Sequence, residues 1–101
     1  MPHDAAEIDE YRVQVEVRVR ALLKKWKSNA TLGDVKDYIL NQNHGTRPRI
    51  WLTDMAKLVG RKCDIVDLDQ AELMVFQDAW NYFPHRSLNG RSPTEVFLEL
   101  S

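Results

Sequence analysis

The feature that most constrains the fold is a stripe of apolar residues near the N-terminus that recurs every three or four positions. The stripe consists of Ile8, Tyr11, Val15, Val19, Leu22 and Trp26. Such spacing places the apolar side chains on one side of a helix, where they pack against the rest of the protein. It predicts a long first helix that continues without interruption through Trp26.

A competing pattern in the same segment is typical of a strand. Between residues 11 and 19, Tyr11 and four valines alternate with polar residues, and alternating β-branched residues favour extended chain. The helix is favoured because the alternation stops at Val19, whereas the stripe continues through Leu22 and Trp26. A strand over residues 11–19 is the alternative, and it would predict pairing between chains, because no second alternating run offers an internal partner.

Val13 and Val17 have a distinct position if the segment is helical. Both then lie on the face opposite the stripe, and two apolar faces on one helix indicate burial against a second body. A second copy of the chain would supply that body, so a homodimer is expected.

Capping and breaking residues predict two further helices in the middle of the chain. Thr31 is a suitable N-cap for a helix from Leu32 to Gln42, because its hydroxyl accepts a hydrogen bond from a free backbone N–H. Pro48 fits the first turn of a third helix, and Gly60 is expected to end it.

Two more helices are predicted in the C-terminal third. Asp67 and Gln70 have the spacing of a capping box that opens a fourth helix, and Pro84 ends it. Ser92 is expected to cap a short terminal helix over residues 93–100, because it is followed directly by a proline. These elements predict an all-α fold, a compact bundle of four to five helices in which the long N-terminal helix packs across the others.

The chain length limits this fold to one unit. At 101 residues with 44% hydrophobic content, the chain encloses one modest core, so residues 1–101 are expected to form a single helical domain. No apolar run approaches the roughly 20 residues needed to cross a bilayer. The acidic N-terminus lacks the pattern of a secretory signal, and the single cysteine, Cys63, excludes an internal disulfide. A cytoplasmic location is expected.

The sequence contains no motif typical of a catalytic, metal-binding or cofactor-binding site. Potential soft ligands are isolated from one another in sequence: His3, His44, Cys63 and His85. Ser87 lies near His85 without a nucleophile elbow. The acids between residues 64 and 69 lack the glycine and distal glutamate of a calcium loop, and the four glycines never cluster into a phosphate-binding loop. We therefore expect no enzyme activity, no metal and no cofactor.

One stretch of the first helix is rich in basic residues. It contains Arg18, Arg20, Lys24, Lys25 and Lys27, interleaved with apolar side chains. Such a stretch can lie along phosphates. A solvated helix face is the favoured interpretation, because the net charge of −1 gives no long-range attraction to nucleic acid.

Residues 80–97 resemble the end of the integrase core domain of many transposases. The likeness rests on Trp80-Asn81, Pro84-His85, Leu88-Asn89-Gly90 and Ser92-Pro93-Thr94-Glu95, which match the family's aromatic-Asn pair, Pro-His turn, Leu-x-Gly step and Ser/Thr-Pro-x-Glu helix start. Phe83 stands where the family usually has arginine, and Trp80 where tyrosine is usual. The family's three catalytic carboxylates have no matching positions in this chain, so the resemblance implies a local structure and no strand-transfer activity.

That local structure is expected to be a helix-turn-helix clasp. Leu88 would anchor the turn, and Gly90 would permit a backbone conformation closed to other residues. A polar cluster of His85, Arg86, Asn89 and Arg91 is the candidate binding site for a phosphate, a carboxylate or a partner loop. Capping of the turn itself by Asn89 and Arg86 is the favoured interpretation of these residues.

These observations give a leading functional hypothesis and an alternative. The leading one is a non-enzymatic interaction or regulatory module that acts through protein contacts, with a protein partner or with itself, and does not bind membranes. The alternative is a nucleic-acid-binding accessory or remnant of a mobile element, which would use the basic stretch and the polar turn.

Overall fold

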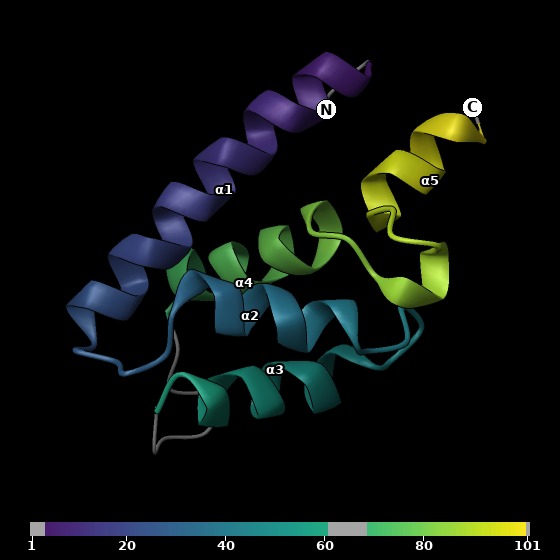
Figure 1. The fold of residues 1–101 in the computed structure, drawn as a ribbon. Helices are drawn as coiled ribbons and strands as arrows, with labels where there is room; N and C mark the ends of the chain where they lie inside the picture. The colour runs from purple at the N-terminus through teal and green to yellow at the C-terminus, as the bar shows by residue number, and fades with distance from the viewer. Residues whose placement is uncertain (1–3, 61–68, 101) are drawn as a thin grey trace.

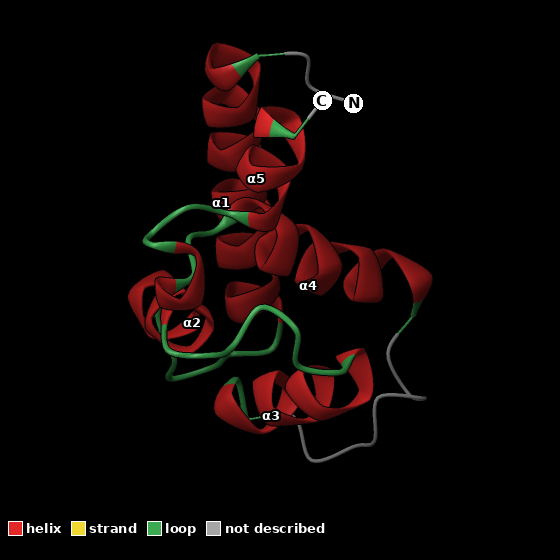
Figure 2. Ribbon diagram, turned by 90° about the vertical axis from the view of Figure 1, so that its right-hand side faces the viewer, coloured by secondary structure: helices red, strands yellow, loops and turns green. Residues whose placement is uncertain are grey.

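The computed structural model describes residues 4–60 and 69–100. Five α-helices and one short 3₁₀-helix make up this part of the chain (Figure 1): α1 Ala5–Lys25, α2 Leu32–Leu40, α3 Pro48–Leu58, α4 Gln70–Tyr82, η2 Arg86–Leu88 and α5 Pro93–Glu99. No strand occurs within the described residues, as the helix-and-loop colouring of Figure 2 shows. The predicted all-α bundle with a long N-terminal helix is confirmed.

The first helix resolves the conflict between the two sequence patterns. Ile8, Val15, Val19 and Leu23 are buried along one side of α1. Val13 and Val17 lie on the opposite side, where 59% and 57% of their surface is exposed. Successive residues of a helix are turned by about 100°, so residues two apart face opposite ways. The same alternation that suggested a strand therefore gives α1 an inner and an outer apolar face.

Local capping chemistry sets most helix ends where the sequence predicted them. Thr31 caps α2 in a reciprocal capping box with Asp34, and Ser92 caps α5 in a second one with Glu95. Gly60 has φ 83°, the left-handed conformation that ends helices. The second helix ends at Leu40 rather than at Gln42, because Asn41 becomes its C-cap and donates a side-chain hydrogen bond to the Asp37 carbonyl.

The predicted start of the fourth helix is wrong by two residues. Asp69 is the N-cap of α4, and its side chain accepts a hydrogen bond from the Glu72 N–H while Glu72 accepts one from the Asp69 N–H. Asp67 itself lies outside the described residues. The Asp69–Glu72 pair has the same three-residue spacing as Asp67–Gln70, and its second carboxylate favours the helix N-terminus more than an amide does.

The core joins the four longer helices. Buried residues from α1, α2, α3 and α4 form one hydrophobic cluster, and Leu98 of α5 packs against its edge. The α1–α4 contact is the most extensive helix–helix contact. In Figure 1, α1 runs along one edge of the molecule, with α2, α4 and α5 all on one side of it.

Candidate functional site

The segment from Phe83 to Ser92, called here the clasp, connects α4 to α5. Phe83, which is fully buried, ends α4 in extended conformation. The backbone N–H of His85 donates to the Arg91 carbonyl at 3.0 Å, and the His85 carbonyl accepts from the Gly90 N–H at 3.0 Å. These two bonds close the turn on itself.

Two consecutive left-handed residues make the closure possible. Asn89 has φ 58° and Gly90 has φ 81°. Asparagine tolerates this region better than most residues, and glycine adopts it at no steric cost. The Leu-Asn-Gly step therefore reverses the chain after η2 and returns it to the start of α5.

His85 lies inside the protein rather than in an exposed polar cluster. Its side chain is fully buried, with Nε2 2.9 Å from the Trp80 carbonyl oxygen and Nδ1 3.3 Å from the Gln42 carbonyl oxygen. Both ring nitrogens therefore face carbonyl oxygens, which accept a hydrogen bond from whichever ring nitrogen carries a proton. The ring fastens the clasp to α4 and to the loop after α2, and it is closed to an external ligand.

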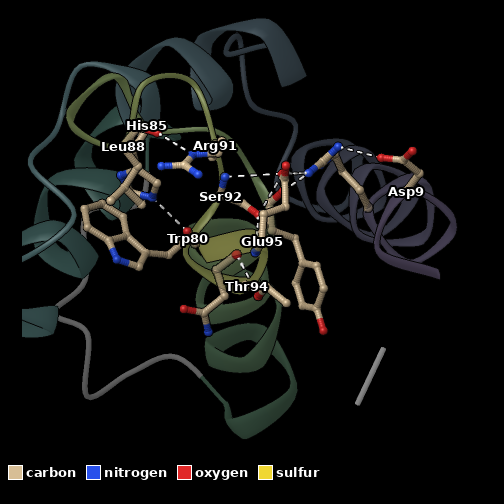
Figure 3. Close-up of polar contacts among 11 residues, drawn as sticks. Asp9, Trp80, His85, Leu88, Arg91, Ser92, Thr94 and Glu95 are labelled. Carbon is tan, nitrogen blue, oxygen red and sulfur yellow. Dashed lines mark hydrogen bonds and ion pairs between the residues drawn. The ribbon is translucent and has the colours of Figure 1, made fainter. Parts of the chain in front are cut away.

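The other three residues of the predicted cluster point to different places. Arg91, which lies beside Leu88 in Figure 3, donates from Nε to the Leu88 carbonyl at 3.2 Å. It also forms an ion pair with Glu99 of α5. Arg86 and Asn89 are exposed, and their side chains form no hydrogen bond or ion pair with other described residues. The structure therefore does not bring the four predicted residues together as one binding site.

Three rings stack beneath the clasp. The indoles of Trp51 on α3 and Trp80 on α4 are parallel, with centroids 4.6 Å apart and an interplanar angle of 4°. The His85 ring meets Trp80 edge-on, again at 4.6 Å. Both indoles are buried, and the stack connects α3 to the end of α4 beneath the clasp.

Ser87 is paired with a different histidine from the one that sequence proximity suggested. Its Oγ lies 3.0 Å from both the backbone N–H and the ring Nδ1 of His44. Both residues are exposed, and no carboxylate bonds to the His44 ring within the described part of the chain. Among the described residues, the pair lacks the third group that orients the base of a catalytic triad. Its hydrogen bonds connect the loop after α2 to the clasp.

Arg12 bonds to three groups on three parts of the chain, and sequence reasoning did not single it out. Its Nε donates to the Tyr82 carbonyl at 2.6 Å, and its other nitrogens form ion pairs with Asp9, at 3.0 Å, and with Glu95. The Tyr82 carbonyl is one of those left free at the end of α4. One guanidinium thus joins α1 to the end of α4 and to the start of α5. Figure 3 labels its two carboxylate partners, Asp9 and Glu95.

Replacement of Arg12 by alanine is expected to lower the free energy of unfolding by about 2 kcal/mol, because a part-buried carbonyl and a carboxylate lose a charged donor. Chemical denaturation followed by circular dichroism measures this change. Arg12→Lys keeps the positive charge but not the planar guanidinium, which can donate several hydrogen bonds at once, so this variant should recover less than half of the lost free energy of unfolding. Arg86→Ala, an exposed arginine in the clasp, is the control, and an equal effect of both alanine variants would contradict the assignment.

The predicted basic stretch is divided between two sides of α1. Arg18 pairs with Asp78 at 3.5 Å and Lys25 with Glu72 at 3.7 Å, both across to α4. Arg20 and Lys24 are exposed and form no ion pair with other described residues. Lys27 lies beyond the end of the helix with φ 51°. The five cations therefore do not form a continuous phosphate-binding strip.

A surface pocket of about 410 Å³ lies beside the junction of α4 and α5. Its lining consists of Asp78, Asn81, Tyr82, Pro93, Thr94 and Phe97. Burial raises the pKa of the Asp78 carboxyl and Arg18 opposes the shift, while the Thr94 hydroxyl is already bonded to the Asn81 carbonyl at 2.9 Å. Two polar groups of this pocket therefore connect helices: Asp78 of α4 pairs with Arg18 of α1, and Thr94 of α5 bonds to α4.

Metal and membrane patterns are equally lacking in the described residues. No group of three or more potential ligand side chains comes together there. None of the helices combines the length and the apolar character needed to cross a bilayer. Comparison of the chain with protein-family models, with curated proteins and with solved structures gives no match in any of the three.

Proposed function

We propose that this chain is a non-enzymatic helical module that acts through protein contacts, chiefly with a second copy of itself, in the cytoplasm. The observation that carries the proposal is the exposure of Val13 and Val17, at 59% and 57%, in the middle of the longest helix. Two adjacent β-branched side chains exposed one helical turn apart are costly in water and favour a partner surface. We call this side of α1 the outer face: Ala6, Glu10, Val13, Val17, Arg20 and Lys24, all of them exposed.

The contacts made by the candidate polar groups support the proposal that this module is non-enzymatic. The His85 ring is enclosed between two backbone carbonyls, and the pairing of Ser87 with His44 lies on the surface without an orienting carboxylate. Glu95, Asp78 and Glu72 bind arginine or lysine side chains across helix contacts. Each of these groups serves to hold the fold together.

Nucleic-acid binding is the competing function, and the exposed Arg20 and Lys24 favour it. The likeness of residues 80–97 to the transposase core end would fit an accessory or remnant of a mobile element. The ion pairs of Arg18 and Lys25 with acids on α4 argue against nucleic-acid binding. Affinity for nucleic acid depends on cations that are free to contact phosphates, and few of the basic residues on α1 are then free.

Sedimentation equilibrium over a range of protein concentrations tests the proposal. The wild-type chain is expected to self-associate, and Val13→Ser with Val17→Ser should weaken the association at least tenfold, because the shared apolar surface is lost. Serine and valine have similar helix propensities, so the fold should survive. Ile50→Ser, at a residue of α3 that is 53% exposed, is the matched control and should have little effect.

A chain that remains monomeric at every concentration would overturn the proposal. Fluorescence anisotropy with labelled DNA then distinguishes the alternative. Binding that weakens steeply with salt, and that is lost on Arg20→Glu with Lys24→Glu, would establish the nucleic-acid function instead.

A further inference from the structure

The charged residues of α1 divide into a paired and an unpaired set. The paired set lies beside the buried stripe: Arg12 with Asp9 and Glu95, Glu16 with Lys36, Arg18 with Asp78, and Lys25 with Glu72. Glu10, Arg20 and Lys24 belong to the outer face and form no ion pair with the rest of the described chain. The outer face is thus the one side of α1 whose charges remain available to a partner.

The outer face also has the spacing of a coiled-coil seam. Its six members follow one another at alternating intervals of four and three residues, from Ala6 to Lys24. This is the interval at which two helices keep a continuous line of contact. The valines occupy the middle of the line, and α1 is long enough to present all six positions.

The order of charges along the seam distinguishes the two ways of pairing it with a copy of itself. In a parallel pair each residue meets its own copy, so Glu10 would face Glu10 and Arg20 would face Arg20, which is repulsive. In an antiparallel pair centred on Val15, Val13 faces Val17 of the second copy and Glu10 faces Arg20. The small Ala6 then faces Lys24, whose aliphatic stem can cover it.

We propose that the outer face of α1 binds the outer face of a second copy in this antiparallel register. The proposal rests on the proposed function and deepens it by specifying the partner surface and its orientation. Charge complementarity selects the antiparallel pair. α1 runs along one edge of the molecule (Figure 1), and all six residues of its outer face are exposed. Because two valines per chain form a small apolar seam, the expected dissociation constant is roughly 10 to 100 µM.

Charge reversal with sedimentation equilibrium tests the register. Glu10→Lys alone and Arg20→Glu alone should each weaken the dimer about tenfold, because each places two like-charged pairs across the seam. The double variant restores both attractions with opposite signs and should recover wild-type affinity. Lys57→Glu, at an exposed position of α3, is the matched control and should leave the affinity unchanged.

The outcomes separate this inference from the proposed function. A monomeric wild-type chain overturns both. A wild-type dimer that is insensitive to the single reversals, or a double variant that stays weak, overturns the antiparallel register while self-association stands.

Disulfide trapping gives an independent measurement on full-length chains that carry Cys63→Ser. Mixed Val13→Cys and Val17→Cys chains should cross-link to each other under mild oxidation, and neither variant should cross-link to itself. In the proposed register, position 13 of one copy is displaced from position 13 of the other by four residues, or about 6 Å along the helix axis. Together with the distance between the two helix axes, this displacement separates the two cysteines by more than a disulfide can span. Cross-linking of Val13→Cys to itself would overturn the proposal.

Discussion

Replacement of His85 by alanine is expected to lower the free energy of unfolding by about 3 kcal/mol. The side chain is fully buried and contacts two backbone carbonyls, and its ring packs edge-on against Trp80. The variant removes the ring that these two carbonyls face and opens a space beside the indole. Urea unfolding followed by tryptophan fluorescence and circular dichroism measures the change.

His44 provides the matched control for this prediction. It is exposed and bonds only to Ser87 at the surface, so His44→Ala is expected to cost less than about 1 kcal/mol. A loss below about 1 kcal/mol for His85→Ala as well would show that the clasp does not depend on the buried ring.

Replacement of Trp51 by alanine is expected to have the largest effect of any single change considered, about 4 kcal/mol. The indole is 3% exposed and lies flat on Trp80, so its removal opens a cavity between α3 and α4 and takes away the support of the clasp. Thermal and chemical unfolding monitored by circular dichroism at matched protein concentration give the loss.

A double-mutant cycle isolates the stacking contribution. Trp51→Phe and Trp80→Phe are milder than alanine variants and keep the chain folded for the cycle. The coupling energy between the two positions is expected to be about 1 kcal/mol, because stacked aromatic pairs contribute beyond their buried area. Strict additivity of the two phenylalanine variants would contradict the stacked arrangement.

The ends of helices were largely predictable because their chemistry is local. Thr31 and Ser92 each bond to backbone and side-chain groups three residues away, and any helix that begins there would present the same partners. The fourth helix shows the limit of this approach. The sequence predicted Asp67 as the cap of this helix, whereas Asp69 is the cap in the structure.

The candidate site was less predictable because its contacts are long-range. His85 was expected at the surface since polar residues surround it in sequence, yet Trp80 and the loop at Gln42 enclose it. In the sequence, Arg12 is one of several polar residues that alternate with apolar ones near the N-terminus. Its partners Tyr82 and Glu95 lie 70 and 83 residues away. No local pattern signals contacts at such separations.

The sequence by itself determined that this chain is helical and where most helices begin and end, because helix propensity, capping and apolar spacing act over one or two turns. It also determined that α1 has two apolar faces, since Val13 and Val17 must oppose Val15 and Val19 in any helix. Only the tertiary structure decided which face is buried, which charges are paired within the chain, and that His85 points inward. Those outcomes depend on which helices meet in space, and packing energies between distant residues set that arrangement.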